Sequence, residues 1–190
     1  MRKIIFDIET DGIITNVGNK QVFPNMYIVC IYDSLTDKYS SYTVEQLKDL
    51  WPILENADML IGYNSDSFDI PILNRYYSGD LSKIASLDLL SEIKNSLGHR
   101  IKMDSVAEAT LGRKKTGHGL QAMEWWKQGK YEDVIKYCTE DVRITKDLYD
   151  YAVANGVLKF KDMGVVKDIK LDTSKWNKKN DSAMTHTLFG

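Results

Sequence analysis

Apolar residues recur along the chain at two spacings, one typical of strands and the other typical of helices. Short apolar runs bounded by turn residues predict four strands, over residues 2–8, 26–32, 38–42 and 59–63. The linker DSLTD joins the second strand to the third and indicates an antiparallel hairpin. Segments with apolar residues three and four positions apart predict helices, over residues 47–54, 68–77, 87–97, 103–111, 120–127 and 131–154.

Glycine and proline residues mark where these elements end. Asn155-Gly156 is expected to end the last long helix, and Pro52 is expected to kink or shorten the first one. Residues 157–161 and 165–171 flank a tight turn and predict a C-terminal β-hairpin.

This order of elements predicts one α/β domain over residues 1–173. Its sheet is mixed: the first three strands run antiparallel, the fourth runs parallel to the first, and helices cover both faces. The chain has 190 residues, of which 43% are hydrophobic, so it is long enough to bury one core. Residues 174–190 are polar, and their composition is typical of a disordered tail or a linker.

Charge and cysteine content narrow the choice of ligand and environment. The 25 basic and 27 acidic residues nearly cancel, so a nucleic acid would have to be held locally, by metal ions or a small basic patch. Cys30 and Cys138 lie in regular segments without metal-binding spacing and are expected to be buried free thiols. No apolar run is long enough for a membrane helix or a signal peptide, which favours a cytoplasmic protein.

The first candidate site lies at the end of the first strand, in the segment KIIFDIETDG. Asp7 and Glu9 are two residues apart, and such residues point to the same face of a strand. Two carboxylates close together at the end of an apolar run favour a divalent cation between them. The alternative is an edge strand whose acids face water, which is the commoner case for an isolated D-x-E.

Two further acidic motifs follow. Asp69 ends the pattern Asn64-x-x-x-Phe68-Asp69 directly after the fourth strand, at the end of the sheet where α/β folds bind their ligands. The alternative role for Asp69 is an ordinary N-cap of the next helix. Tyr137 and Asp141 are four residues apart in the last long helix, so they share one face. A face that combines core packing with solvent exposure would explain the same spacing.

In this order the three motifs resemble those of the DnaQ-like superfamily of 3′–5′ exonucleases, in the DEDDy subclass whose third motif carries a tyrosine. The resemblance covers residues 3–150 and is closest to the proofreading exonuclease domains of DNA polymerases and to stand-alone or helicase-attached exonuclease domains. It implies a ribonuclease H-like fold with a mixed five-stranded sheet. It also implies a hydrolase that releases nucleoside 5′-monophosphates from the 3′ end of single-stranded nucleic acid, with DNA favoured. Proofreading or DNA repair beside a polymerase or helicase would be its setting.

The same resemblance assigns roles to the residues of the three motifs. Asp7, Glu9, Asp69 and Asp141 would bind two Mg²⁺ or Mn²⁺ ions for hydrolysis by a two-metal-ion mechanism. Tyr137 would position the attacking water.

Five other residues are candidates for substrate contacts. By the resemblance, Thr10, Asn64 and Phe68 lie where relatives contact the terminal nucleotides. Ile13 lies where some relatives place an apolar wedge against the last base. Lys115 belongs to a basic run that is either a phosphate-contacting loop or a solvated surface turn.

Several alternatives stay open at this point. One of the adjacent tryptophans Trp125 and Trp126 could stack on a base, and at least one is expected in the core. The substrate could be RNA or small oligonucleotides, because no motif encodes sugar specificity. A nuclease-fold module that binds nucleic acid or a helicase with little catalysis is the third option. The four acids and Tyr137 favour catalysis, since a binding module has no need of four acids in one cleft.

Overall fold

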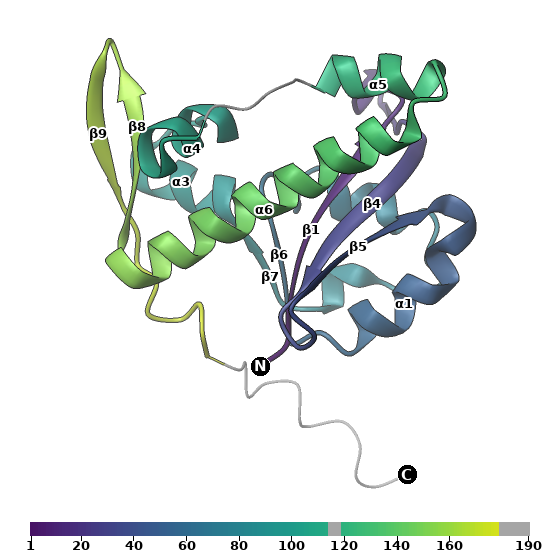
Figure 1. Cartoon of the computed structure of the whole chain (residues 1–190), viewed down its shortest axis with the longest axis horizontal. Coiled ribbons are helices and arrows are strands. Elements are labelled where there is room, and N and C mark those ends of the chain that lie inside the picture. Colours follow the sequence, from purple (N-terminus) through teal and green to yellow (C-terminus); the bar gives the residue numbers. More distant parts are fainter. Residues whose placement is uncertain (114–118, 179–190) are drawn as a thin grey trace, which may run out of the picture.

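A mixed five-stranded sheet forms the centre of the computed structural model, which describes residues 1–113 and 119–178 (Figure 1). The strands lie in the order β5-β4-β1-β6-β7. Their bounds are Lys3–Thr10 for β1, Met26–Asp33 for β4, Lys38–Thr43 for β5, Met59–Gly62 for β6 and Ser86–Asp88 for β7. β4 pairs antiparallel with β1 and β5, whereas β6 runs parallel to β1 and β7. The predicted directions of the first four sheet strands are confirmed.

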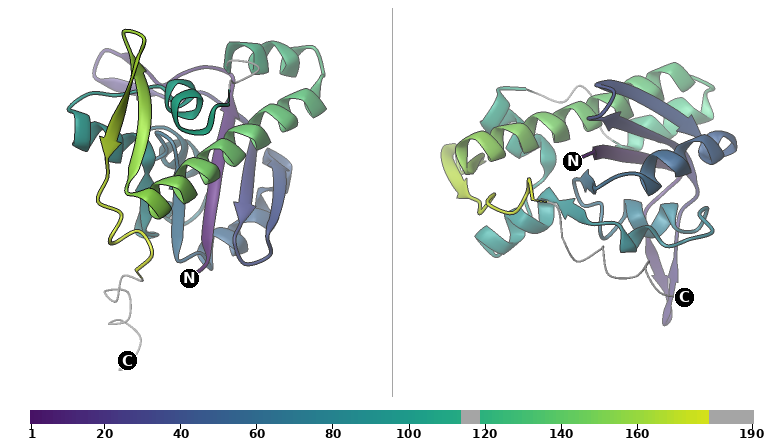
Figure 2. Two further views of the ribbon diagram at one scale, coloured as in Figure 1. Left: turned by 60° about the vertical axis from the view of Figure 1, so that its left-hand side comes forward. Right: turned by 90° about the horizontal axis from the view of Figure 1, so that it is seen from below.

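Helices cover both faces of this sheet, as predicted (Figures 1 and 2). One face carries α3 (Leu89–Leu97), α4 (Met103–Leu111), α5 (Gly119–Lys127) and the long α6 (Tyr131–Asn155). The other face carries α1 (Leu47–Glu55) and α2 (Asp69–Leu73), with short 3₁₀ turns at Val44–Gln46 and Leu81–Lys83.

Alternation along β1 divides the core into two layers. Ile4, Phe6 and Ile8 pack with α1 and α2, while Ile5 packs with α6. Because residues two apart share a face, the odd-numbered positions after Ile5 also face α6. The acids of the first motif occupy those positions.

The predicted C-terminal hairpin is present as β8 (Val157–Asp162) and β9 (Val165–Lys170). It rises beside α4 (Figures 1 and 2), and its buried side chains are Leu158, Phe160 and Ile169. Gly156, at φ 66°, ends α6 where the sequence predicted. Glycine adopts this left-handed conformation at little cost.

Three segments differ from the predicted pattern. Residues 87–97 form the strand β7 and then α3, because Asp88 caps a helix that begins at Leu89. The helix expected over residues 68–77 ends at Leu73. The polar segment after β1 forms an exposed hairpin, β2 (Thr15–Val17) with β3 (Lys20–Val22), whose residues show no apolar alternation. Pro52, expected to kink or shorten α1, lies inside that nine-residue helix.

The segment after β9 is held against the domain by Trp176. This side chain is buried and stacks on Tyr149 of α6, with 5.8 Å between ring centroids. The Tyr149 hydroxyl donates a hydrogen bond of 2.8 Å to Asn177 Oδ1. None of the helices within residues 1–113 and 119–178 is both long and apolar enough to span a bilayer.

Candidate active site

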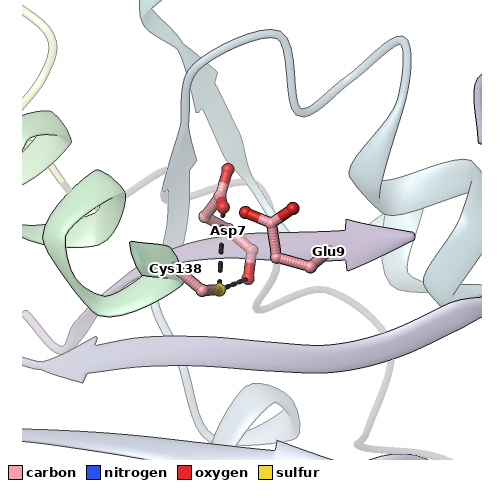
Figure 3. A group of neighbouring side chains, drawn as sticks. All are labelled: Asp7, Glu9 and Cys138. Atoms are coloured by element: carbon pink, nitrogen blue, oxygen red, sulfur yellow. Dashed lines mark hydrogen bonds between the residues drawn. The ribbon is translucent and has the colours of Figure 1, made fainter. Parts of the chain in front are cut away.

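Asp7 and Glu9 lie side by side on β1 and face α6 (Figure 3). A carboxylate oxygen of each and the sulfur of Cys138 all lie within 4.8 Å of one another. β1 is the central strand of the sheet and Glu9 is 8% exposed, so the alternative of an edge strand with water-facing acids is wrong. Within residues 1–113 and 119–178 no other such group of metal-ligating side chains occurs, and Asp69 and Asp141 lie outside this one.

Asp69 is the first residue of α2, and its carboxylate turns back to β1. Its Oδ1 accepts a hydrogen bond of 3.2 Å from the backbone N–H of Ile8, which stands between the two acids of β1. β6 pairs with β1 only as far as Ile5, so the carboxylate occupies the edge of β1 where the parallel ladder has ended. Asp69 therefore does more than begin a helix, because it ties α2 to the strand that carries the first motif.

The third motif reaches β1 through Cys138. Its sulfur lies 3.4 Å from the carbonyl oxygen of Asp7 and 3.7 Å from Asp7 Oδ2 (Figure 3). Burial raises the pKa of the Cys138 thiol, and Cys30 and the nearby acids raise it further, so the thiol stays protonated and donates to Asp7. Tyr137 and Asp141, on the same part of α6, are buried as well. Both cysteines are buried and free, as predicted.

Asp88 holds the loop between β6 and α2, a role that the sequence analysis missed. Its carboxylate accepts hydrogen bonds from the backbone N–H groups of Asn64, at 2.7 Å, and Asp66, at 3.3 Å. Asn64 has φ 72°, a left-handed conformation that asparagine tolerates, and its side-chain oxygen accepts a hydrogen bond from Arg100. The available signal was an aspartate directly before a helix, since Asp88 also accepts from Leu90 N–H.

A cavity of about 350 Å³ opens beside Glu9 of β1. Its lining consists of Ile8, Glu9, Thr10, Gly12, Ile13, Phe68 and Met123. Three of the predicted substrate-contact residues thus share one mostly apolar pocket with an acid of the first motif. Met123 of α5 could not be predicted from the sequence, because its place in the pocket depends on how α5 packs.

The remaining substrate candidates have different surroundings. Asn64 lies in the loop held by Asp88 and does not line the pocket. The Thr10 hydroxyl, although at the pocket, donates a hydrogen bond of 2.7 Å to the Gly12 carbonyl. Lys115 lies outside the described residues. Arg113, which begins the same basic run, forms a 2.6 Å ion pair with Asp147 of α6.

The two adjacent tryptophans pack against other aromatic rings. Trp126 stacks on Tyr27 of β4, with 4.5 Å between ring centroids and 9° between planes. Trp125 lies edge-to-face with Tyr137 of α6, at 6.3 Å and 69°. These contacts attach α5 to both the sheet and α6.

The sheet order, the strand directions and the helices on both faces define a ribonuclease H-like α/β fold. A model of the RNase H superfamily matches residues 4–153, and the chain belongs to that superfamily. None of the curated proteins matches the chain.

Among solved structures, the chain is similar to the family B DNA polymerase from the hyperthermophilic archaeon Pyrobaculum calidifontis. The similarity has a TM-score of 0.62 at 19% identity, and it covers 80% of this chain and 24% of the polymerase chain. At this identity the likeness shows a shared fold. The chain spans about a quarter of the polymerase's length.

Burial makes Asp69 sensitive to pH. It raises the pKa of this carboxyl from 3.8 to about 7, although the N–H groups of Ile8 and of Asp69 itself oppose the rise. Because the pKa is raised in the folded state, the metal-free protein takes up a proton on folding between about pH 4 and pH 7. The contribution of Asp69 to stability is therefore fully present below pH 4 and is lost as the pH rises through 7.

Replacing Asp69 with asparagine is accordingly expected to stabilise the metal-free protein at pH 8. The amide keeps an acceptor for Ile8 N–H and stays neutral, so the gain should reach about 2–4 kcal/mol at pH 8 and vanish near pH 4. Urea unfolding in chelator at both pH values measures this difference. Asp66→Asn, a neighbouring change at an exposed residue, is the matched control. If Asp69→Asn raised the free energy of unfolding equally at both pH values, the raised pKa of Asp69 would be contradicted.

Proposed function

We propose that the chain is a metal-dependent 3′–5′ exonuclease of the DnaQ-like type, in the DEDDy subclass. The observation that carries the proposal is that the helices carrying the second and third motifs both contact β1 beside the acids of the first motif. Asp69 bonds to Ile8 between the two acids of the strand, and Cys138 of the third motif packs on Asp7. Membership of the RNase H superfamily and the likeness to a DNA polymerase support a nuclease that acts on DNA.

The donor set suits two hard divalent cations. Asp7, Glu9, Asp69 and Asp141 would supply oxygen ligands, which Mg²⁺ and Mn²⁺ prefer. Three of these four acids are less than a tenth exposed, and carboxylates buried to that extent are costly as anions unless a cation is near. When bound, the ions would supply an activated water and stabilise the leaving oxygen.

The other residues would hold the 3′ end of a strand against this centre. The pocket beside Glu9 would take the terminal base, since its apolar wall includes Ile13 and Phe68 and its volume of about 350 Å³ suits one nucleotide unit. Tyr137 would orient the attacking water. Single-stranded DNA is the proposed substrate, with nucleoside 5′-monophosphates as products and a polymerase or helicase as the proposed partner.

Degradation of single-stranded DNA and RNA of one sequence, each labelled at its 5′ end, tests this proposal. With Mg²⁺ the labelled DNA should shorten progressively, and a 3′-terminal phosphorothioate linkage or added chelator should stop it. Faster loss of the RNA would reassign the substrate. Cleavage of circular single strands would make the protein an endonuclease, and metal-independent binding without cleavage would make it a binding module.

A further inference from the structure

Helix α5 is fixed to the start of α6 by a tight turn. The backbone N–H of Lys130 donates a hydrogen bond of 2.9 Å to the carbonyl oxygen of Trp125. Gly129, at φ 72°, donates one of 3.0 Å to Trp126. The turn therefore sets where the two tryptophan side chains of α5 lie relative to α6.

Trp126 contributes two ring contacts to the attachment of α5 to the rest of the domain. Its ring stacks on Tyr27 of β4 and lies 4.6 Å from the ring centroid of Tyr131, the first residue of α6. Stacked aromatic pairs of this kind are among the stronger side-chain contacts. The attachment of α5 thus has contacts that do not involve Trp125.

Trp125 makes its ring contact with Tyr137, in an edge-to-face arrangement. Tyr137 is 8% exposed, and its neighbour Cys138 packs on Asp7. Trp125 does not line the cavity beside Glu9, whereas Met123 of the same helix does. The ring of Trp125 therefore contacts Tyr137 of the third motif and does not form part of the cavity beside Glu9.

We propose that Trp125 is a positioning residue, which holds the Tyr137 ring so that its hydroxyl orients the attacking water. This inference rests on the proposed function. A phenol ring on a helix can tilt about its side-chain torsions, and a second ring against its side restricts that motion. Groups that align a reactant must be held within about 0.5 Å of the productive position, so a modest tilt is enough to slow the reaction.

Single-stranded DNA hydrolysis by Trp125→Leu and Trp125→Phe, each with and without Tyr137→Phe, tests the assignment. Trp125→Leu should lower kcat about 10- to 100-fold with KM changed less than about 2-fold. Trp125→Phe, which keeps an aromatic ring, should recover most of the rate. In the Tyr137→Phe background Trp125→Leu should cause no further loss, because both changes remove the same alignment.

Trp126→Leu is the matched control for the attachment of α5, and thermal melting checks the fold of each variant. A smaller loss of kcat in Trp126→Leu than in Trp125→Leu supports the assignment. The assignment is overturned if Trp126→Leu lowers kcat as much as Trp125→Leu does, or if Trp125→Leu keeps full turnover. It is also overturned if Trp125→Leu lowers kcat by the same factor in the Tyr137→Phe background as in the wild type. Should Trp125→Leu fail to fold, Trp125→Met is carried through the same comparison. If the wild-type protein has no nuclease activity, the proposed function is refuted. If it is active but Trp125→Leu does not change kcat, only the positioning role of Trp125 is refuted.

Discussion

Replacing Asp7 with alanine is expected to reduce nuclease activity at least about 1,000-fold while leaving the fold intact. Asp7 lies next to Glu9 and contacts Cys138 of α6, and it would hold the proposed metal ions together with Glu9. Loss of this ligand would weaken binding of the ions on which the proposed reaction depends. The measurement is the rate of mononucleotide release from single-stranded DNA at saturating Mg²⁺.

The melting temperature separates this effect from unfolding. In chelator the Asp7→Ala protein should melt no lower than the wild type, because the change removes one of two neighbouring negative charges. Added Mn²⁺ should raise the melting temperature of the wild type and not that of the variant, since only a bound ion stabilises the folded state. Asp66→Ala, at an exposed acid of the β6–α2 loop, serves as the control and should keep both activity and the Mn²⁺ response. Retained activity in Asp7→Ala, free of contaminating nuclease, would end the two-metal proposal.

The central part of the fold could be predicted because its pattern is local. The apolar run of β1 has the alternation of a strand, and that alternation alone places Asp7 and Glu9 on one face. Short-range residue spacing likewise predicts the two-carboxylate motif, the hairpin of β4 with β5 and the long α6. A ribonuclease H-like sheet could then be expected from the resemblance of the three motifs.

Features that depend on tertiary packing could not be predicted from the sequence. β7 is three residues long and continues directly into α3, so an apolar run of residues 87–97 has the spacing of a single helix. Asp88 gains its role from bonds to a loop 22 and 24 residues away along the chain. Met123 reaches the pocket because Trp126 fixes α5 on Tyr27. Trp176 lies in a polar segment that the sequence predicted to be a disordered tail or a linker, yet its side chain is buried against Tyr149.

Tyr137→Phe is expected to slow hydrolysis about 100-fold while binding of single-stranded DNA changes little. The hydroxyl is proposed to orient a water whose attack occurs only in the transition state. Loss of an interaction made there lowers kcat and kcat/KM together. The phenylalanine ring keeps the edge-to-face contact with Trp125, so packing of α5 should persist and the melting temperature should stay near that of the wild type.

The metal concentration decides how a loss of rate in Tyr137→Phe is interpreted. Tyr137 and Asp141 lie one helical turn apart on α6, so a shift of the helix could loosen an ion bound by Asp141 and imitate the loss of an oriented water. Water orientation predicts a deficit that persists at saturating Mg²⁺ and Mn²⁺. Full recovery at high Mn²⁺ would assign the effect to metal affinity, and a raised KM with unchanged kcat would make Tyr137 a substrate-binding residue. Because Trp125 is proposed to act through this hydroxyl, either of these results would remove the role of Trp125 as well.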